Sequence, residues 1–238
     1  MKALVNILLI FGFVLTWSCA DSDSAPATQP TQSGSTTFKY LALGDSYTIG
    51  QSVCETCCFP AQLTDSLGTY IGTNDISIQL IAQTGWTTSN LIAAIEDAAP
   101  PADFDLVTLL IGVNNQYQNK PFSLYEAEFP QLVTTAILLA KGDKNNVIVV
   151  SIPDYAFTPF GQSSSNPSEI SVEIDQYNAF AKSYCEQNDI GFVDITDITR
   201  EGLNNSALVA SDGLHPSEVA YTEFTRRILP IASAKLLD

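Results

Sequence analysis

One serine, one histidine and one aspartate in this sequence have the types and spacing that nucleophilic catalysis requires. Ser46 follows a short apolar run and the pair Gly44-Asp45. His215 is the only histidine of the 238 residues, so a serine with an imidazole base must use it. Asp212 lies three residues earlier, close enough for its carboxylate to hold one ring nitrogen while the other faces the serine. These residues predict a serine nucleophile, a histidine base and an orienting aspartate.

A serine that attacks a carbonyl also needs hydrogen-bond donors around the oxyanion that forms. Two further segments offer them. Gly85, in AQTGWTTSN, lets its N–H approach a ligand with no side chain in the way. Asn114, in LLIGVNNQY, carries a side-chain amide donor. Each segment alone also fits an ordinary turn, so the prediction depends on whether the fold brings them together.

Five strand-like runs alternate with helix-like stretches, and this order brings the candidate residues to one edge. Strand and helix in alternation imply a parallel sheet with helices on both faces. We therefore expect a three-layer α/β/α, flavodoxin-like sandwich with strand order 2-1-3-4-5, in which the ends of strands one, two and three are neighbours. The segment 155–171 has no clear period and is expected to be a surface loop. The expected strands are 39–44, 76–83, 105–112, 146–153 and 190–196, and the helices lie near 60–71, 88–98, 123–141, 172–188 and 217–237.

The candidate segments, in this order, resemble the SGNH, or GDSL-type, serine esterase superfamily. Gly44-Asp45-Ser46 matches its first block, Gly85 its second and Gly112-Val113-Asn114 its third. The run from Asp212 to Pro216 matches its fifth block. The resemblance extends from about Lys39 to the C-terminus, and the set in this order is specific although each block is short.

The resemblance implies a role for each candidate residue. Ser46 would be the nucleophile, His215 the general base and acid, and Asp212 its orienting partner. The backbone N–H groups of Ser46 and Gly85 and the side chain of Asn114 would form the oxyanion hole. The implied activity is hydrolysis of carboxylic esters, short acyl or O-acetyl, through an acyl-enzyme, with no metal or organic cofactor.

Asn115 stands where the superfamily usually has an aspartate. Because Asn114 is kept, we expect the chemistry to survive and only local loop packing to differ. The alternatives are a non-catalytic exported protein that binds a glycan or lipid on the same fold, and a lipid-anchored structural protein. A binder has no need of the complete catalytic set, which favours the enzyme. The substrate, a small-molecule or glycan ester, stays open; aromatic residues that could stack on a sugar are Trp86, Tyr117, Tyr155, Phe157 and Phe160.

The formal charge of −16, from 10 basic and 26 acidic residues, argues against nucleic-acid binding, because such a surface repels phosphate backbones. Residues 1–19 have a short positive start and an apolar stretch that fit a lipoprotein-type signal peptide, with Cys19 as the lipidated residue. Residues 20–37 form a polar linker, and 38–238 the hydrolase domain. We expect an exported bacterial protein, periplasmic or anchored at the outer membrane by this lipid alone, and a monomer.

Export favours disulfides over free thiols among the remaining cysteines. Zinc is weakly supported, because no second cysteine pair or histidine cluster completes four ligands. We expect a disulfide within the loop after Ser46, joining Cys54 to Cys57 or Cys58, with Cys58 preferred because one more intervening residue eases the disulfide dihedral. Cys185 is expected to be a buried thiol; a long-range bridge from it to this loop is the rival.

Overall fold

The computed structural model of this protein describes residues 37–72 and 75–234. The predicted signal peptide, Cys19 and most of the linker lie outside the described residues. Among the helices that are described, none is long and apolar enough to cross a membrane.

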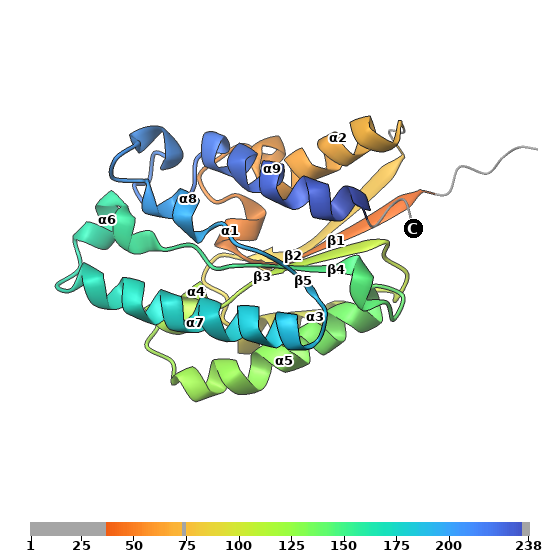
Figure 1. Cartoon of the computed structure of the whole chain (residues 1–238), viewed down its shortest axis with the longest axis horizontal. Coiled ribbons are helices and arrows are strands. Elements are labelled where there is room, and N and C mark those ends of the chain that lie inside the picture. Colours follow the sequence, from red (N-terminus) through yellow and green to blue (C-terminus); the bar gives the residue numbers. More distant parts are fainter. Residues whose placement is uncertain (1–36, 73–74, 235–238) are drawn as a thin grey trace, which may run out of the picture. The chain divides into compact units, whose positions relative to one another are not determined.

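The sheet has five parallel strands in the order β2-β1-β3-β4-β5, which confirms the predicted topology (Figure 1). The central strands are buried over most of their length because helices cover both of their faces. Edge strand β2 is instead mostly exposed. Its parallel register with β1 pairs Asp45 with Gln83, so the two strands end side by side. The strands are β1 (Phe38–Asp45), β2 (Ile76–Gln83), β3 (Leu106–Leu110), β4 (Val147–Val150) and β5 (Gly191–Val193).

Helices α2 and α9 pack on one face of the sheet and α3, α5 and α7 on the other (Figure 1). The α5/α7 layer is held by aromatic rings, among them Tyr125 and Tyr177 with centroids 4.6 Å apart. The longer helices are α2 (Phe59–Ile71), α3 (Thr88–Ala98), α5 (Phe122–Leu139), α7 (Pro167–Gln187) and α9 (Glu218–Ala234). The shorter α-helices are α1 (Ser46–Ile49), α4 (Val113–Tyr117), α6 (Pro159–Gln162) and α8 (Thr196–Arg200), and the 3-10 helices are η1 (Glu55–Cys57), η2 (Lys144–Asn146), η3 (Tyr155–Phe157) and η4 (Ser206–Leu208).

The segment 155–171 is not the structureless loop that the sequence predicted. It contains η3, α6 and the first turn of α7, which begins at Pro167 rather than near 172. Pro167 occupies the first helical turn, where its fixed φ suits a helix and its missing N–H costs nothing. The serines that precede Pro167 are typical of a loop, so the sequence did not predict a helix start at this proline.

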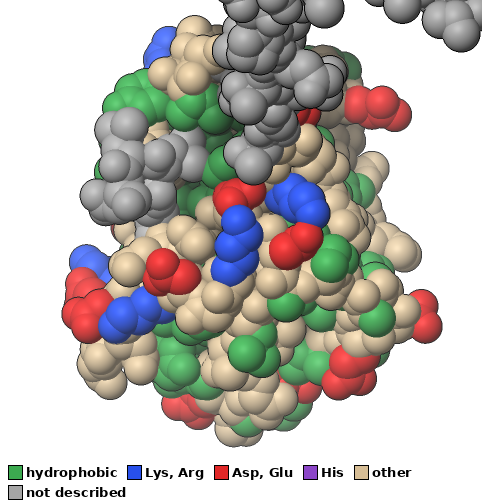
Figure 2. Space-filling model, turned by 90° about the vertical axis from the view of Figure 1, so that its right-hand side faces the viewer, with side chains coloured by type: hydrophobic (Ala, Val, Ile, Leu, Met, Phe, Trp, Pro, Cys, Tyr) green, Lys and Arg blue, Asp and Glu red, His purple; other side chains and the backbone are tan. Residues whose placement is uncertain are grey.

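Positive side chains gather at the amino ends of the strands. Lys39, at the start of β1, pairs with Asp103, and Lys141 pairs with Asp105 just before β3. Figure 2 shows lysine or arginine and acidic side chains lying next to one another on one face of the molecule. Ser46, Gly85 and Asn114 lie just after the opposite, carboxyl ends of β1, β2 and β3, where open α/β folds bind ligands.

Candidate active site

Ser46 is the first residue of α1 and directly follows β1. The chain can turn so sharply there because Gly44 has no side chain. A Cβ on Gly44 would lie 2.1 Å from Thr48 Oγ1 and 2.5 Å from the Leu110 carbonyl oxygen. Only glycine therefore lets α1 and β3 close around the end of β1. The Ser46 side chain faces a cavity, although the residue is only 3% exposed.

Asp212 and His215 form the hydrogen-bonded pair that the sequence predicted. Asp212 Oδ2 lies 2.6 Å from His215 Nδ1. The other carboxylate oxygen accepts from the backbone N–H groups of Leu214 (2.9 Å) and His215 (3.0 Å). The side chain and the backbone of the same turn thus fix the imidazole, and its Nε2 is left for the cavity. Tyr47 supports the ring, with centroids 5.1 Å apart.

The Asp212 carboxylate is stabilised in its charged form. Partial burial alone would raise its pKa, but hydrogen bonds from Ser52 and His215 outweigh burial and hold that pKa well below the ordinary range. Asp212 is therefore anionic at neutral pH. An anionic carboxylate is what a histidine needs in order to accept a proton while its other nitrogen stays bonded.

One cavity of about 260 Å³ joins the predicted residues. Ser46, Gly85, Asn114 and His215 all line it, and Asp212 lies behind the imidazole. Within the described part of the chain, Ser46 Oγ has no hydrogen-bond partner, so the hydroxyl can turn toward His215 or toward a bound carbonyl. The remaining lining is mostly apolar and comes from Tyr47, Thr84, Val113, Tyr117, Tyr155, Phe160 and Leu214.

The two predicted oxyanion donors from β2 and β3 reach this cavity by different means. Gly85 has a left-handed φ of +83°, which exposes its backbone after β2. Gly112 has φ +132° and packs so closely on Tyr125 that a Cβ would lie 2.7 Å from the ring. This contact fixes the start of α4 and, with it, Asn114. The Asn114 Nδ2 atom donates to Trp86 O (3.1 Å) and Asp45 Oδ2 (3.2 Å).

Asp45 is a functional candidate that the sequence suggested only as part of the turn before Ser46. It is fully buried, and its carboxylate accepts from the Tyr47 N–H (3.0 Å) as well as from Asn114. Burial raises the pKa of Asp45 to about 7, because within the described residues no cation pairs with it. The residue therefore orients the Asn114 amide from behind the cavity.

Asn115 does more than adjust a loop. It is fully buried; its Oδ1 accepts from Thr88 N (2.9 Å) and its Nδ2 donates to Thr88 Oγ1 (2.6 Å). The Thr88 hydroxyl in turn donates to Glu128 on α5. Asn115 thus fastens the start of α3 to α4. An aspartate at position 115 could not donate to the Thr88 hydroxyl and would place a second carboxylate beside it, although that hydroxyl already donates to Glu128.

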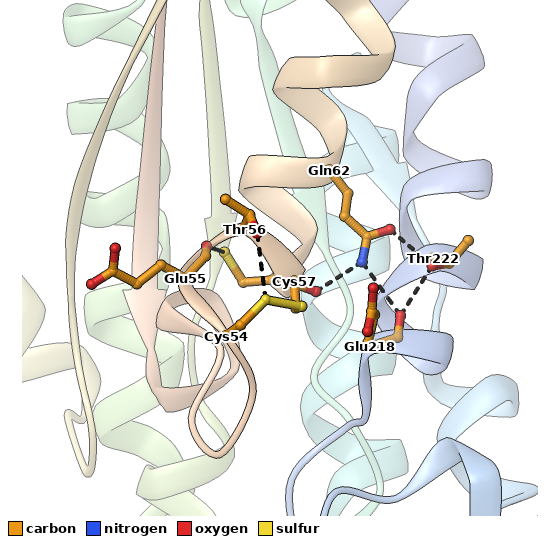
Figure 3. The surroundings of a disulfide bond; sticks show 8 residues. Cys54, Glu55, Thr56, Cys57, Gln62, Glu218 and Thr222 are labelled. Carbon is orange, nitrogen blue, oxygen red and sulfur yellow. Dashed lines mark hydrogen bonds between the residues drawn. A yellow bond between two sulfur atoms is a disulfide. The ribbon is translucent and has the colours of Figure 1, made fainter.

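The predicted disulfide is present, but the preferred pairing was wrong. Cys54 bonds to Cys57, not to Cys58 (Figure 3). The 3-10 turn η1 brings the two Cα atoms within 5.0 Å of each other, and Cys57 N donates to Cys54 O. Cys58 is instead the N-cap residue that precedes α2, and its buried thiol donates to Glu55 O. Cys185 is a buried free thiol, as expected.

Of the five aromatic residues that could stack on a sugar, three line the cavity that contains Ser46. Tyr117, Tyr155 and Phe160 pack together, with centroids 6.0 to 6.5 Å apart, and line the catalytic cavity. Trp86 and Phe157 pack against the hydrophobic core instead. Among the described residues, no group of three His, Cys, Asp or Glu side chains is placed to hold a metal ion.

A comparison with known protein families agrees with the resemblance that the sequence motifs indicated. The model of the GDSL-like lipase/acylhydrolase family matches residues 42–222. No curated protein sequence matches the chain.

Solved structures of similar fold include several esterases. A variant of Axe2, an acetyl xylan esterase from Geobacillus stearothermophilus, is 23% identical with a TM-score of 0.61, covering 82% of this chain and 94% of that one. The psychrotrophic esterase EstA from Pseudoalteromonas sp., inhibited by monoethylphosphonate, is 16% identical with a TM-score of 0.57, covering 84% and 99%. TesA is 16% identical with a TM-score of 0.63, covering 83% and 99%.

Asp45 generates a prediction about stability and pH. Its folded-state pKa of about 7 lies above the value of an unfolded aspartate, so the folded protein holds a proton that the unfolded chain has released. The Asp45 contribution to the free energy of unfolding is therefore complete at low pH and is lost as pH rises toward neutral. Denaturant titrations from pH 4.5 to 7.5 should show this decline in the wild type and a flatter profile in Asp45→Asn. Equal slopes in the two proteins would show that Asp45 ionises freely in the folded state.

Proposed function

The chain belongs to the GDSL-like lipase/acylhydrolase family and hydrolyses carboxylic esters, and we propose that it does so through an acyl-enzyme formed on Ser46. One observation carries this proposal: Ser46 and the Asp212-bound His215 meet at one cavity with Gly85 and Asn114. This combination of hydroxyl, imidazole, carboxylate and amide donors is the one that acyl transfer through a serine nucleophile requires.

In the proposed reaction the Ser46 hydroxyl attacks the ester carbonyl while His215 Nε2 takes its proton. The resulting imidazolium is held by Asp212. The oxyanion is met by the N–H groups of Ser46 and Gly85 and by Asn114 Nδ2. The tetrahedral intermediate collapses, His215 returns the proton to the leaving alcohol, and the acyl group remains on Ser46. Water activated by His215 then attacks the acyl group on Ser46, and the second tetrahedral intermediate collapses to release the acid and restore the Ser46 hydroxyl.

The Asn114 amide contributes most if it changes partners during the reaction. In the free protein its Nδ2 contacts are 3.1 and 3.2 Å, at the long end for N–H···O bonds. A developing oxyanion is a stronger acceptor than the Trp86 carbonyl. Asp45 binds the same Nδ2 atom and can keep its contact while the other N–H turns to the oxyanion, so the exchange needs no large movement of the side chain. This places the stabilisation in the transition state rather than in substrate binding.

The cavities favour a short acyl group and a neutral, hydroxyl-bearing alcohol. The catalytic cavity of about 260 Å³ is small and mainly apolar. A second cavity of about 390 Å³ adjoins it and shares the wall formed by Tyr117, Tyr155 and Phe160. Its lining carries Glu169 and Glu173 but no lysine or arginine. Amides and carboxylates beside aromatic rings suit hydroxyl groups, and the carboxylates repel anionic leaving groups.

The nucleophile and base are tested with a short-chain chromogenic ester. Ser46→Ala and His215→Ala should each lower kcat by roughly a thousandfold or more, since each member of a triad is needed for the same step. Both side chains lie at the cavity wall, so the melting temperature should change little. Turnover near the wild-type level in either variant would refute the role of that residue. A fully inactive wild type would favour the non-catalytic glycan- or lipid-binding protein.

Asn114 and Asn115 should separate catalysis from stability. Asn114→Ala should lower kcat by about a hundredfold with KM nearly unchanged, because the amide acts on the oxyanion. Asn115→Asp should instead lower the free energy of unfolding by about 1–3 kcal/mol, the cost of an unsatisfied buried polar contact, and leave kcat of the folded protein close to wild type. Steady-state kinetics and denaturant titration of both variants decide this. The reverse pattern would mean that the two asparagines have exchanged roles.

The substrate proposal predicts an order of specificity constants. An acetylated neutral glycoside should be hydrolysed with a higher kcat/KM than an acetyl ester whose alcohol carries a carboxylate or phosphate. The difference in kcat/KM between neutral and charged alcohols should be smaller in the double variant Glu169→Gln/Glu173→Gln, which removes the repulsion but keeps the polar lining. Hexanoyl and longer esters should be poorer than acetyl esters. Equal preference for charged and neutral alcohols would exclude the polar cavity as the leaving-group site.

We also propose that the protein is exported and anchored through a lipid on Cys19, and that it acts as a monomer. The support is the lipoprotein-type pattern of residues 1–19 together with the Cys54–Cys57 disulfide, which forms in oxidising compartments. Fractionation of bacterial cells that express the full chain should place it in the membrane fraction. Cys19→Ala should move it out of that fraction. A cytosolic location for the wild type would contradict export.

A further inference from the structure

A short loop between α1 and α2, residues 50–58, contacts the catalytic Asp–His pair from the side of the nucleophile. Ser52 in this loop has a left-handed backbone, with φ +69°, although it is not glycine. Such a conformation is uncommon for a residue with a Cβ, and it persists only where surrounding contacts impose it. Contacts around Ser52 must therefore hold its backbone in this conformation.

The contact that this conformation makes is a hydrogen bond to the triad. Ser52 Oγ donates to Asp212 Oδ2 at 2.6 Å. The same oxygen faces His215 Nδ1, and Oδ1 accepts from two backbone N–H groups. With four donors, the carboxylate has a fixed plane as well as a fixed position. The orientation of the imidazole follows from that plane.

Ser52 and Asp212 are both solvent-exposed residues, so water competes for this hydrogen bond. The contact lasts only if the loop itself is held. Three contacts hold it near Ser52: Gln51 N donates to Ser46 O at 3.0 Å, Gln51 Oε1 accepts from Thr84 Oγ1 at 2.6 Å, and Val53 N donates to Gly50 O at 3.2 Å. The first two tie the loop to Ser46 and Thr84, which line the catalytic cavity, and the third closes a turn within the loop.

The far end of the loop is held by the disulfide. Cys54–Cys57 closes the turn η1, and the Cys57 carbonyl accepts from Gln62 Nε2 at 2.8 Å (Figure 3). The same Gln62 side chain bonds Thr222 Oγ1 at 2.9 Å and Glu218 O at 3.3 Å, at the start of α9. Helix α9 begins three residues after His215. The disulfide turn is thus hydrogen-bonded, through Gln62, to the helix that follows the base.

We propose that Ser52 is a positioning residue for ester hydrolysis, acting through Asp212, and that the Cys54–Cys57 disulfide keeps it in place. The inference rests on the proposed function of Ser46, Asp212 and His215. Ser52 touches neither the substrate nor the reacting atoms. Its hydroxyl secures the carboxylate at the oxygen that orients the base, and the cross-link restrains the exposed turn that follows Ser52.

The first test removes the Ser52 hydroxyl without straining the backbone. Glycine adopts positive φ freely, so Ser52→Gly should keep or raise the melting temperature. It should nevertheless lower kcat on a short-chain ester by roughly tenfold to a hundredfold, the rate equivalent of one hydrogen bond to a charged group, with KM little changed. Ser52→Ala keeps the Cβ and should lose the same kcat whatever its stability. Glu55→Ala, in the same loop, should match the wild type.

The second test asks whether the disulfide acts through Ser52. Cys54→Ser/Cys57→Ser should lower kcat in the wild-type background but cost little more when combined with Ser52→Gly, because both changes disturb one contact. Fully multiplicative losses would show that the disulfide works independently of Ser52. Wild-type kcat in both Ser52 variants would overturn the proposal. Ser46→Ala is the reference variant. If Ser46→Ala still hydrolyses the ester, the proposed function of Ser46 is wrong, and a loss of kcat in the Ser52 variants could not be assigned to the triad.

Discussion

The hydrogen bond between Asp212 and His215 is the interaction that the rest of the site depends on. In the proposed reaction an imidazole takes a proton from Ser46, and an anion that holds its other nitrogen at the correct angle favours this step. The 2.6 Å contact meets this need, and two backbone N–H groups of the same turn support the carboxylate. The sheet supplies the other half of the site, because three neighbouring strands end at one edge.

Two aspartates of the site are placed in opposite environments. Asp212 is partly exposed and receives four donors, which keep its pKa low and its charge in place. Asp45 is fully buried with two donors, and its pKa is raised to about 7. In the proposed reaction, Asp212 stabilises the positive charge that forms on His215. Asp45 orients an amide, which does not require a full charge. Their surroundings therefore separate two roles that the same side chain could perform.

Much of this arrangement was predictable from the sequence because it depends on patterns. Apolar runs gave the strands, their alternation with helices gave the parallel sheet, and the strand ends placed Ser46, Gly85 and Asn114 together. The fixed three-residue spacing of Asp212 and His215 also predicted their contact. These features follow from local spacing and from the geometry of parallel sheets.

The remaining features depend on loop conformation, which spacing does not determine. The cysteine pairing was set by a single 3-10 turn at Glu55–Cys57, so the preferred partner was wrong by one residue. Ser52 gave no signal, because its role needs a left-handed backbone and a partner 160 residues away. Asn115 was expected to affect only a loop, yet it joins two helices through Thr88.

The central claim is that Ser46 is the residue that becomes acylated. The most direct measurement is the mass of the intact protein after treatment with an alkyl fluorophosphonate, followed by peptide mapping. The account predicts one adduct per chain, located on Ser46, that forms more slowly in His215→Ala because the hydroxyl then lacks its base. An adduct on another side chain, or an unmodified protein that still hydrolyses esters, would contradict it.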